Sequence, residues 1–290
     1  LGISALIVPL GVDRQLVLLD VPLMIAASIT TYGMSLDGQI NRIEGGLLFG
    51  GLVAYTLWSI WKSRQQSNPE VLQEFSEEFP RVEQPGAKFV LLQCALLLLG
   101  LAMLVKGADL FLDSAVVLAR GWGFSELVIG LTLVAAGTSL PEVATSVVAA
   151  IKGERDLAVG NVIGSSLFNL LGVLGFAGLI APAGIPVSES AMSQDIPVLL
   201  ATAIACIPIF LTGNCIARWE GGLLFSYHLI YTAYLIFSAQ QWQSGIDGIA
   251  QLLWVMVPLT LAALAISLLK NSARPTPATA NVLPPEQDQP

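Results

Sequence analysis

Long apolar stretches alternate with short polar ones along almost the whole chain. Eight of these stretches reach the length of roughly 20 residues that a helix needs to cross a bilayer, and residues 1–10 resemble the last part of a further one. The pattern therefore predicts an all-α polytopic membrane protein with eight complete spanning helices and one partial helix. The eight stretches are residues 15–36, 43–62, 88–118, 124–151, 156–181, 193–212, 218–239 and 248–269.

The composition agrees with this class and narrows the function. Hydrophobic residues make up 54% of the 290 residues and charged residues only 12%, and the mean hydropathy is +0.74, as is typical of membrane-embedded chains. Much of the net charge of −8 lies in residues 70–83 and in the tail, so nucleic-acid binding has no support. Cys94, Cys206 and Cys215 lack metal-binding spacing. Because no nucleophile–base pair or phosphate-binding loop is visible, we expect no enzymatic activity and no cofactor.

An internal repeat organises the chain. LGISALIVPLG at residues 1–11 resembles LGFAGLIAPAG at 174–184, and the likeness continues for about sixty residues. It includes Asp-Val-Pro at 20–22 with Asp-Ile-Pro at 195–197, and the Arg-x-Glu-Gly-Gly-Leu-Leu-Phe segments that begin at Arg42 and Arg218. Most Lys and Arg residues lie on one side of the predicted spans, which makes that side cytoplasmic and places Arg42 and Arg218 on opposite sides. The copies are therefore expected to form an inverted repeat, as in many secondary transporters.

The repeat also predicts how the chain is divided. By this alignment about 85 residues of the first copy should precede Leu1, including its counterpart of residues 124–175. We therefore expect the first repeat motif to be absent from this chain. The predicted parts are 1–62 as the remainder of a first membrane half, 63–87 as a cytoplasmic linker, 88–239 as a second membrane half, 248–269 as an additional transmembrane helix and 270–290 as a disordered tail.

A polar stripe marks the candidate site in residues 124–151. Thr138, Ser139, Glu142, Thr145 and Ser146 recur at helical spacing, with the carboxylate at the middle of the stripe. An ionisable residue within a spanning helix is by default a functional-site hypothesis, because burying its charge in hydrocarbon is costly. For Thr145 and Ser146, bonding of the hydroxyl back to its own helix is the favoured alternative.

A proline within the same stretch adds potential oxygen ligands. Pro141 lacks an N–H and leaves the carbonyl of Gly137 without its usual helical partner. Backbone carbonyls of this kind can line a cavity at membrane depth. Together with the hydroxyls of Thr138 and Ser139 and the carboxylate of Glu142, they form an oxygen donor set that suits Na⁺ or Ca²⁺.

The next span carries a second polar stripe. Gly160 and Gly164 are spaced so that this helix could approach a neighbour closely. Asn161, Ser165 and Asn169 could add oxygens to the same cavity, and the two asparagines could equally join helices by hydrogen bonds. Elsewhere, Asp20 and Asp195 lie near helix starts and are expected to be structural, and His228 is expected to be a packed interfacial side chain.

These segments resemble a known family. Gly-Thr-Ser-Leu-Pro-Glu at 137–142, Gly-Asn-Val-Ile-Gly-Ser at 160–165 and Phe-Asn at 168–169 resemble the signature α-repeat of the calcium/cation antiporter superfamily, and within it the bacterial sodium/calcium exchangers. The resemblance implies an inverted-repeat exchanger fold of two five-helix halves, N-terminally incomplete here and with one extra C-terminal helix. The ion-binding residues it implies are Glu142, Thr138, Ser139, Gly137, Asn161, Ser165 and Ser166. Ser166 departs from the family, which usually has Asn or Asp there, so ion choice is left open.

The function predicted from the resemblance is secondary active antiport. Ca²⁺ would be exchanged for Na⁺ by alternating access, with these ions and the lipid bilayer as partners, in an integral membrane protein of the bacterial inner membrane. Exchange of a divalent cation for H⁺ is one alternative. A transport-inactive membrane scaffold is the other, because the first repeat is expected to be absent. The sequence does not indicate an oligomeric state.

Overall fold

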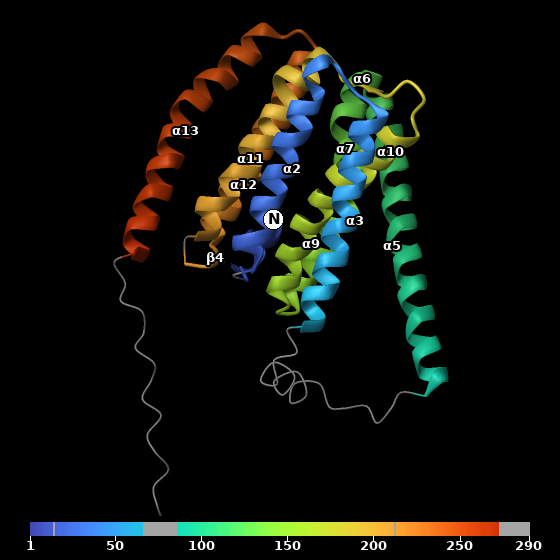
Figure 1. Cartoon of the computed structure of the whole chain (residues 1–290). Coiled ribbons are helices and arrows are strands. Elements are labelled where there is room, and N and C mark those ends of the chain that lie inside the picture. Colours follow the sequence, from blue (N-terminus) through green and yellow to red (C-terminus); the bar gives the residue numbers. More distant parts are fainter. Residues whose placement is uncertain (14, 66–85, 212, 273–290) are drawn as a thin grey trace, which may run out of the picture.

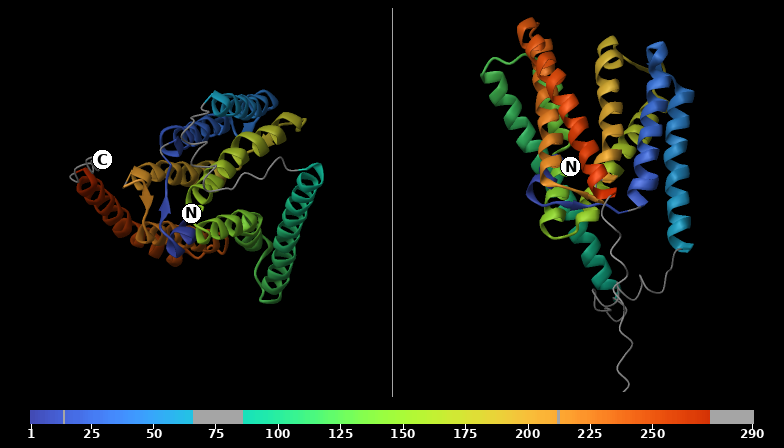
Figure 2. Two further views of the ribbon diagram at one scale, coloured as in Figure 1. Left: turned by 90° about the horizontal axis from the view of Figure 1, so that it is seen from below. Right: turned by 90° about the vertical axis from the view of Figure 1, so that its left-hand side faces the viewer.

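The computed structural model describes residues 1–13, 15–65, 86–211 and 213–272, and nearly all of them are helical. The helices run roughly along one common direction, as the views of Figures 1 and 2 show together. The α-helices are α1 (Gly2–Ile7), α2 (Val21–Met34), α3 (Arg42–Gln65), α5 (Ala87–Gly121), α6 (Glu126–Ile129), α7 (Ala135–Thr138), α8 (Leu140–Ile151), α9 (Arg155–Leu167), α10 (Gly175–Ile180), α11 (Ile196–Leu211), α12 (Arg218–Ala239) and α13 (Gln243–Ser272).

Short irregular helices connect several of these elements. Four are π-helical, namely η1 (Leu16–Asp20), η3 (Gly130–Val134), η4 (Phe168–Leu174) and η5 (Ala191–Asp195), and η2 (Ser35–Asp37) is a 3₁₀-helix. The strands are β1 (Leu10–Gly11), β2 (Gln39–Ile40), β3 (Ile185–Pro186) and β4 (Cys215–Ile216).

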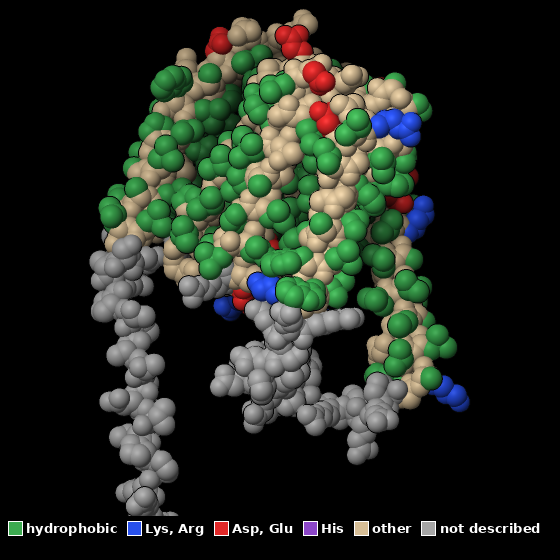
Figure 3. All heavy atoms as spheres, viewed as in Figure 1, with side chains coloured by type: hydrophobic (Ala, Val, Ile, Leu, Met, Phe, Trp, Pro, Cys, Tyr) green, Lys and Arg blue, Asp and Glu red, His purple; other side chains and the backbone are tan. Residues whose placement is uncertain are grey.

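The helical segments agree with the spans expected from hydropathy. Seven helical runs in the described residues are long and apolar enough to cross a membrane, and the bent pair formed by residues 126–138 and 140–151 makes a possible eighth. Figure 3 shows hydrophobic side chains over most of this face, with most charged side chains toward its two ends. Most of the predicted linker 63–87 and of the predicted tail 270–290 lies outside the described residues.

The two sequence repeats are joined to each other at both ends of the bundle. β1, from the first copy, pairs antiparallel with β4 from the second, with Leu10 opposite Ile216. β2, from the first copy, pairs antiparallel with β3 from the second, with Ile40 opposite Ile185. α3 runs downward and α12 upward in Figure 1, so their starts lie at opposite ends. The repeats are therefore inverted with respect to each other, as the sequence predicted.

The helices of each copy also pack against the other copy. α1 packs on α12, and α10 packs on α3. The Nε atom of Arg42 donates to the carbonyl of Leu179 over 3.0 Å, and a guanidinium nitrogen of Arg218 donates to the carbonyl of Ile7 over 3.1 Å. Each arginine thus caps the last carbonyls of a helix from the opposite repeat, where cationic groups are favoured.

Glycines allow these two helix crossings to be very close. A Cβ atom added to Gly45 in α3 would lie 2.4 Å from the backbone nitrogen of Leu179, and one added to Gly221 in α12 would lie 2.9 Å from the carbonyl oxygen of Gly2. Such distances leave no space for a side chain. The Glu-Gly-Gly segments shared by the two repeats therefore mark the contact points between them.

Candidate functional site

The predicted helix break lies at Ser139. α7 ends at Thr138, α8 begins at Leu140, and the two meet at an angle of 40°. Pro141 lies in the first turn of α8, where its missing N–H is tolerated. The break therefore places Ser139 at the bend and Glu142 in the first turn of the new helix.

Glu142 faces a cavity of about 460 Å³ between α1, α8, α9 and α12. Its Oε2 atom is buried, and it has no hydrogen-bond partner among the described residues. A buried carboxylate oxygen without a partner is costly, so it calls for a cation or a proton. The lining residues with polar side chains are Ser4, Ser139, Glu142, Ser146, Ser165, Ser166, Asn169 and His228.

The structure brings together four of the seven predicted ligands. Ser139, Glu142, Ser165 and Ser166 line the cavity, and both of the latter serines donate to the carbonyl of Val162. A serine hydroxyl that donates this way still has lone pairs for a cation. The structure therefore places four of the predicted oxygen donors around one cavity, and their role as ligands stays a prediction.

Gly137, Thr138 and Asn161 do not line this cavity. Gly137 is buried, and an added Cβ would lie 2.6 Å from a methyl carbon of Leu112 in α5. The Thr138 hydroxyl is exposed and donates to the carbonyl of Ala135 over 3.0 Å. In this structure Gly137 therefore serves helix packing, and Thr138 bonds to its own helix.

Asn161 joins α9 to α8. Its Nδ2 atom lies 2.9 Å from the Ser146 hydroxyl, 3.0 Å from the Thr145 hydroxyl and 3.2 Å from the Glu142 carbonyl, so two hydrogens are shared among three acceptors. Thr145 itself donates to the carbonyl of Pro141, as the back-bonding alternative predicted. Of the two roles left open for Asn161, the structure shows the interhelical one, which holds the backbone of Glu142 in place.

The prediction of a close helix approach at Gly160 and Gly164 is wrong. A Cβ atom added at either position would meet no heavy atom within 4 Å in the described part of the chain. The closest approaches lie at Gly45 and Gly221, and also at Gly175, where an added Cβ would lie 2.6 Å from the backbone nitrogen of Phe49. Small residues at such a spacing permit a close approach, but they do not specify which neighbour a helix meets. The sequence pattern therefore could not separate Gly160 and Gly164 from the glycines at the observed crossings.

The sequence predicted a packed interfacial side chain at His228, but this residue is exposed and lines the same cavity as Glu142. It comes from α12, and the two are the ionisable side chains among the described lining residues. Its spacing from the repeat motif gives no hint of this, because the two segments meet only through the tertiary fold. No three His, Cys, Asp or Glu side chains of the described residues cluster as a metal site, and Glu142 is the one carboxylate among the described residues that line this cavity.

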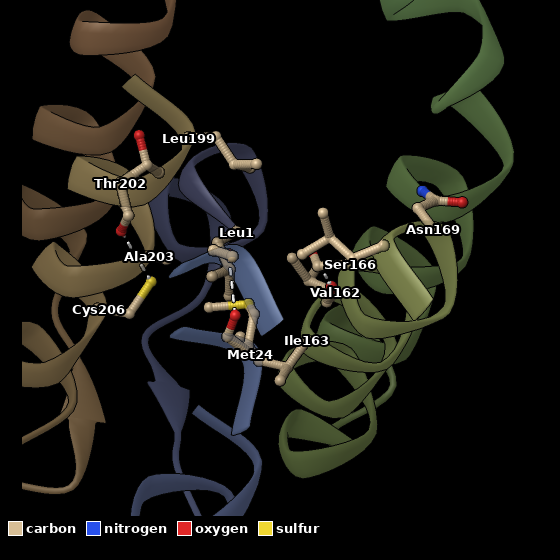
Figure 4. A pocket seen from close by; sticks show the side chains of 12 residues that line it. Leu1, Met24, Val162, Ile163, Ser166, Asn169, Leu199, Thr202, Ala203 and Cys206 are labelled. Carbon is tan, nitrogen blue, oxygen red and sulfur yellow. Dashed lines mark hydrogen bonds between the residues drawn. The ribbon is translucent and has the colours of Figure 1, made fainter. Parts of the chain in front are cut away.

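A second cavity of about 320 Å³ adjoins the first (Figure 4). Residues of α9 and η4 lie on one side of it and residues of α11 on the other, with Met24 of α2 between them. Ser28 of α2 also lines this cavity. Ser166 and Asn169 line both cavities. They therefore connect the carboxylate-bearing cavity to a more apolar space beside the central helices.

Comparison with known proteins identifies the family. The sequence profile of the sodium/calcium exchanger protein family matches residues 92–237, which include all seven predicted ligands. The chain belongs to the sodium/calcium exchanger family. It is 36% identical over 243 residues to CaxA of Alkalimonas amylolytica, which its name gives as an antiporter, and the match covers 82% of this chain and 74% of CaxA.

Two further relatives align with this chain over smaller shares of their own lengths. The inner membrane protein YrbG of Escherichia coli is 36% identical, covering 70% of this chain and 62% of YrbG. The sodium/calcium exchanger MaX1 of Methanosarcina acetivorans is 38% identical, covering 49% of this chain and 40% of MaX1.

A solved exchanger has the same fold. The sodium–calcium exchanger NCX_Mj, in a structure soaked with zero Na⁺ and Ca²⁺, superposes with a TM-score of 0.61 at 29% identity. The match covers 79% of this chain and 68% of that structure's chain. The predicted inverted-repeat exchanger fold is thus confirmed for the part of the chain that the match covers.

Proposed function

We propose that this protein exchanges Ca²⁺ for Na⁺ across a membrane by alternating access, and that the cavity at Glu142 binds the ions. The observation that carries the proposal is the buried Oε2 atom of Glu142, which has no described hydrogen-bond partner and faces a cavity lined with hydroxyl oxygens. Hard cations take oxygen ligands of this kind. Membership of the exchanger family, with relatives named as sodium/calcium exchangers, supports the same function.

Competition for one set of oxygens would couple the two ion fluxes. Ca²⁺ requires the charge of Glu142, and Na⁺ bound near the Ser139 hydroxyl would draw on the same carboxylate. Occupancy by one ion therefore disfavours the other, and each must leave before its competitor enters. This arrangement suits a site near the middle of the membrane between inverted repeats, and we propose a bacterial inner membrane as its location.

The direct test is ion-driven uptake in reconstituted liposomes. The purified protein is placed in liposomes loaded with Na⁺, and these are diluted into Na⁺-free buffer that contains ⁴⁵Ca²⁺. We expect uptake that collapses when the Na⁺ gradient is removed, and that is unchanged when a proton ionophore is added. Uptake that ignores the Na⁺ gradient would contradict the proposal.

Exchange of a divalent cation for H⁺ is the second candidate, and His228 favours it. An imidazole can bind and release a proton, and His228 lines the same cavity as Glu142. If protons are the counter-ion, a pH jump will drive ⁴⁵Ca²⁺ uptake in the complete absence of Na⁺. His228→Gln would then remove much of that pH-driven uptake, whereas it should leave Na⁺-driven uptake largely intact.

Ser166 offers a prediction about ion preference. It lines the cavity with a neutral hydroxyl, so Ser166→Asp adds a second carboxylate to a site with one. We expect the half-saturating Ca²⁺ concentration to fall by about tenfold, because Ca²⁺ affinity rises with the number of charged ligands. The matched control is Ser166→Asn, which has nearly the same shape without the charge and should change the value little. Equal effects of the two variants would show that charge is not the cause.

A further inference from the structure

The two repeats share a carboxylate at the end of a π-helical turn. Asp20 ends η1 and Asp195 ends η5, and a proline follows two positions later in both cases. The next N–H donates five residues back, from Val21 to Leu16 and from Ile196 to Ala191. A proline in a helix prevents the usual bond and crowds the preceding turn, which explains why the turn widens.

Each of these carboxylates accepts a hydrogen bond from a tyrosine. The tyrosine lies in the helix after the central one, in α3 for Asp20 and in α12 for Asp195. The Tyr55 hydroxyl of α3 donates to the Oδ1 atom of Asp20 over 2.7 Å, and the Tyr231 hydroxyl of α12 donates to Oδ1 of Asp195. Asp20 is only 7% exposed. Because a carboxylate within a span is costly, its retention in both repeats with the same partner indicates a shared task.

The two Asp–Tyr ties, Asp20–Tyr55 and Asp195–Tyr231, connect helices whose main packing partners differ, although α2 and α3 both contact η4, and α11 and α12 both contact α13. α2 packs on α11 and α9, whereas α3 packs on α10 and η4. In the second repeat α11 packs on α2, whereas α12 packs on α1 and α13. Each tie therefore joins one of the two central helices, α2 and α11, to an outer helix.

The ties also lie toward opposite ends of the bundle. Asp20 immediately precedes α2, Asp195 immediately precedes α11, and these helices run in opposite directions (Figure 1). Both helices contribute walls to the second cavity, through Met24 and Ser28 of α2 and through Thr202 and Cys206 of α11 (Figure 4). Each tie thus fixes one end of a cavity wall.

We propose that the four residues of the two Asp–Tyr ties are positioning residues that set the balance between the two access states, each tie holding the second cavity closed at its own face. This inference rests on the proposed function, since the second cavity shares Ser166 and Asn169 with the proposed ion-binding cavity and would be part of the same access route. Loosening one tie favours opening toward the face at which that central helix begins. Because the repeats are inverted, loosening the other tie favours the opposite face.

The test measures access to the cavity from each face without requiring transport. Ser166→Cys provides a reporter in the cavity wall, in a background with Cys94, Cys206 and Cys215 replaced by serine. A membrane-impermeant maleimide is applied to either face of oriented vesicles, and labelling rates are compared for Tyr55→Phe, Tyr231→Phe and the double variant. Tyr234→Phe is the matched control, because its ring stacks on that of Tyr231 from the same helix.

We expect Tyr55→Phe to raise the ratio of labelling rates toward the face where α2 begins by about fivefold. Tyr231→Phe should shift the ratio to the other face, the double variant should return it near the parent value, and the control should leave it unchanged. Shifts in the same direction, or none, would overturn the proposal.

Asp20→Asn gives a second variant in case Tyr55→Phe fails to reach the membrane. Its amide oxygen still accepts the Tyr55 hydroxyl, so a shift in the same direction but smaller is expected, and a shift to the opposite face would overturn the proposal. Ion-driven uptake is measured separately, in protein that keeps Ser166. An unchanged labelling ratio, with uptake present in that protein, refutes the role of the ties alone. Absent uptake in that protein refutes the proposed function and leaves the labelling result valid.

Discussion

Replacing Glu142 with Gln is expected to reduce Na⁺-dependent ⁴⁵Ca²⁺ uptake to the level of protein-free liposomes. The substitution keeps the shape of the side chain but removes the charge of the carboxylate that faces the cavity. The remaining described polar side chains of the lining are hydroxyls, one amide and one imidazole, which cannot balance a divalent cation. Loss of the charge therefore removes the main electrostatic attraction for Ca²⁺.

The matched control for this substitution is Glu126→Gln. Glu126 lies on the same bent helical pair, but its side chain is 69% exposed and forms an ion pair with Arg120 at 2.6 Å. Exposed pairs of this kind contribute little to stability, so the variant should fold and transport normally. Glu142→Asp retains the charge on a shorter side chain and should keep partial uptake. Full uptake by Glu142→Gln in correctly inserted protein would refute the assignment of the site.

Alanine at Gly45 or Gly221 is expected to destabilise the protein strongly. The new Cβ at Gly45 would overlap the backbone of Leu179, and that at Gly221 would overlap the backbone of Gly2 and the Cβ of Ala5. Backbone atoms cannot move aside as a flexible side chain can, so the repeats must separate locally. Overpacking of this kind costs about 1–3 kcal/mol, and thermal unfolding of the purified protein in detergent measures it.

Each repeat provides its own control one residue later. A Cβ added at Gly46 or Gly222 would lie 3.4 Å from the flexible end of a leucine side chain, which can adjust. Alanine also favours helix over glycine by about 1 kcal/mol. Gly46→Ala and Gly222→Ala should therefore leave the unfolding temperature unchanged or raise it. If Gly46→Ala and Gly222→Ala lowered the unfolding temperature as much as alanine at Gly45 and Gly221, the close helix crossing would not be the cause.

The sequence predicted those features that depend on local chemistry. Pro141 lacks an N–H wherever it lies, so the break in the helix could be inferred without knowledge of the fold. The buried charge of Glu142 was likewise inferred from the apolar residues around it. The inverted repeat was inferred from polar positions that the two copies share, such as Arg42 and Arg218. A chance likeness between two apolar segments would not extend to such positions.

Features that depend on which helices meet could not be inferred in the same way. Asn161 was placed on the polar stripe, but only the packing of α8 on α9 decides that its amide reaches Ser146. His228 enters the cavity because α12 closes one side of it. Gly160 and Gly45 look alike in sequence, yet only Gly45 lies at a helix crossing. Hydropathy indicates that a helix is inserted but not which helix lies beside it. This is why the role of Asn161 was left open and why the expectations for Gly160 and His228 differ from the structure.

The exchange of packing partners between the repeats has a consequence for biogenesis. α1 lies against α12, and the bond between Arg218 and the carbonyl of Ile7 joins residues 211 positions apart. During synthesis α12 must therefore be inserted into the membrane before α1 can form its final contacts. Until then the C-terminal end of α1 lacks its Arg218 cap, so the first repeat completes its packing only after α12 has been made.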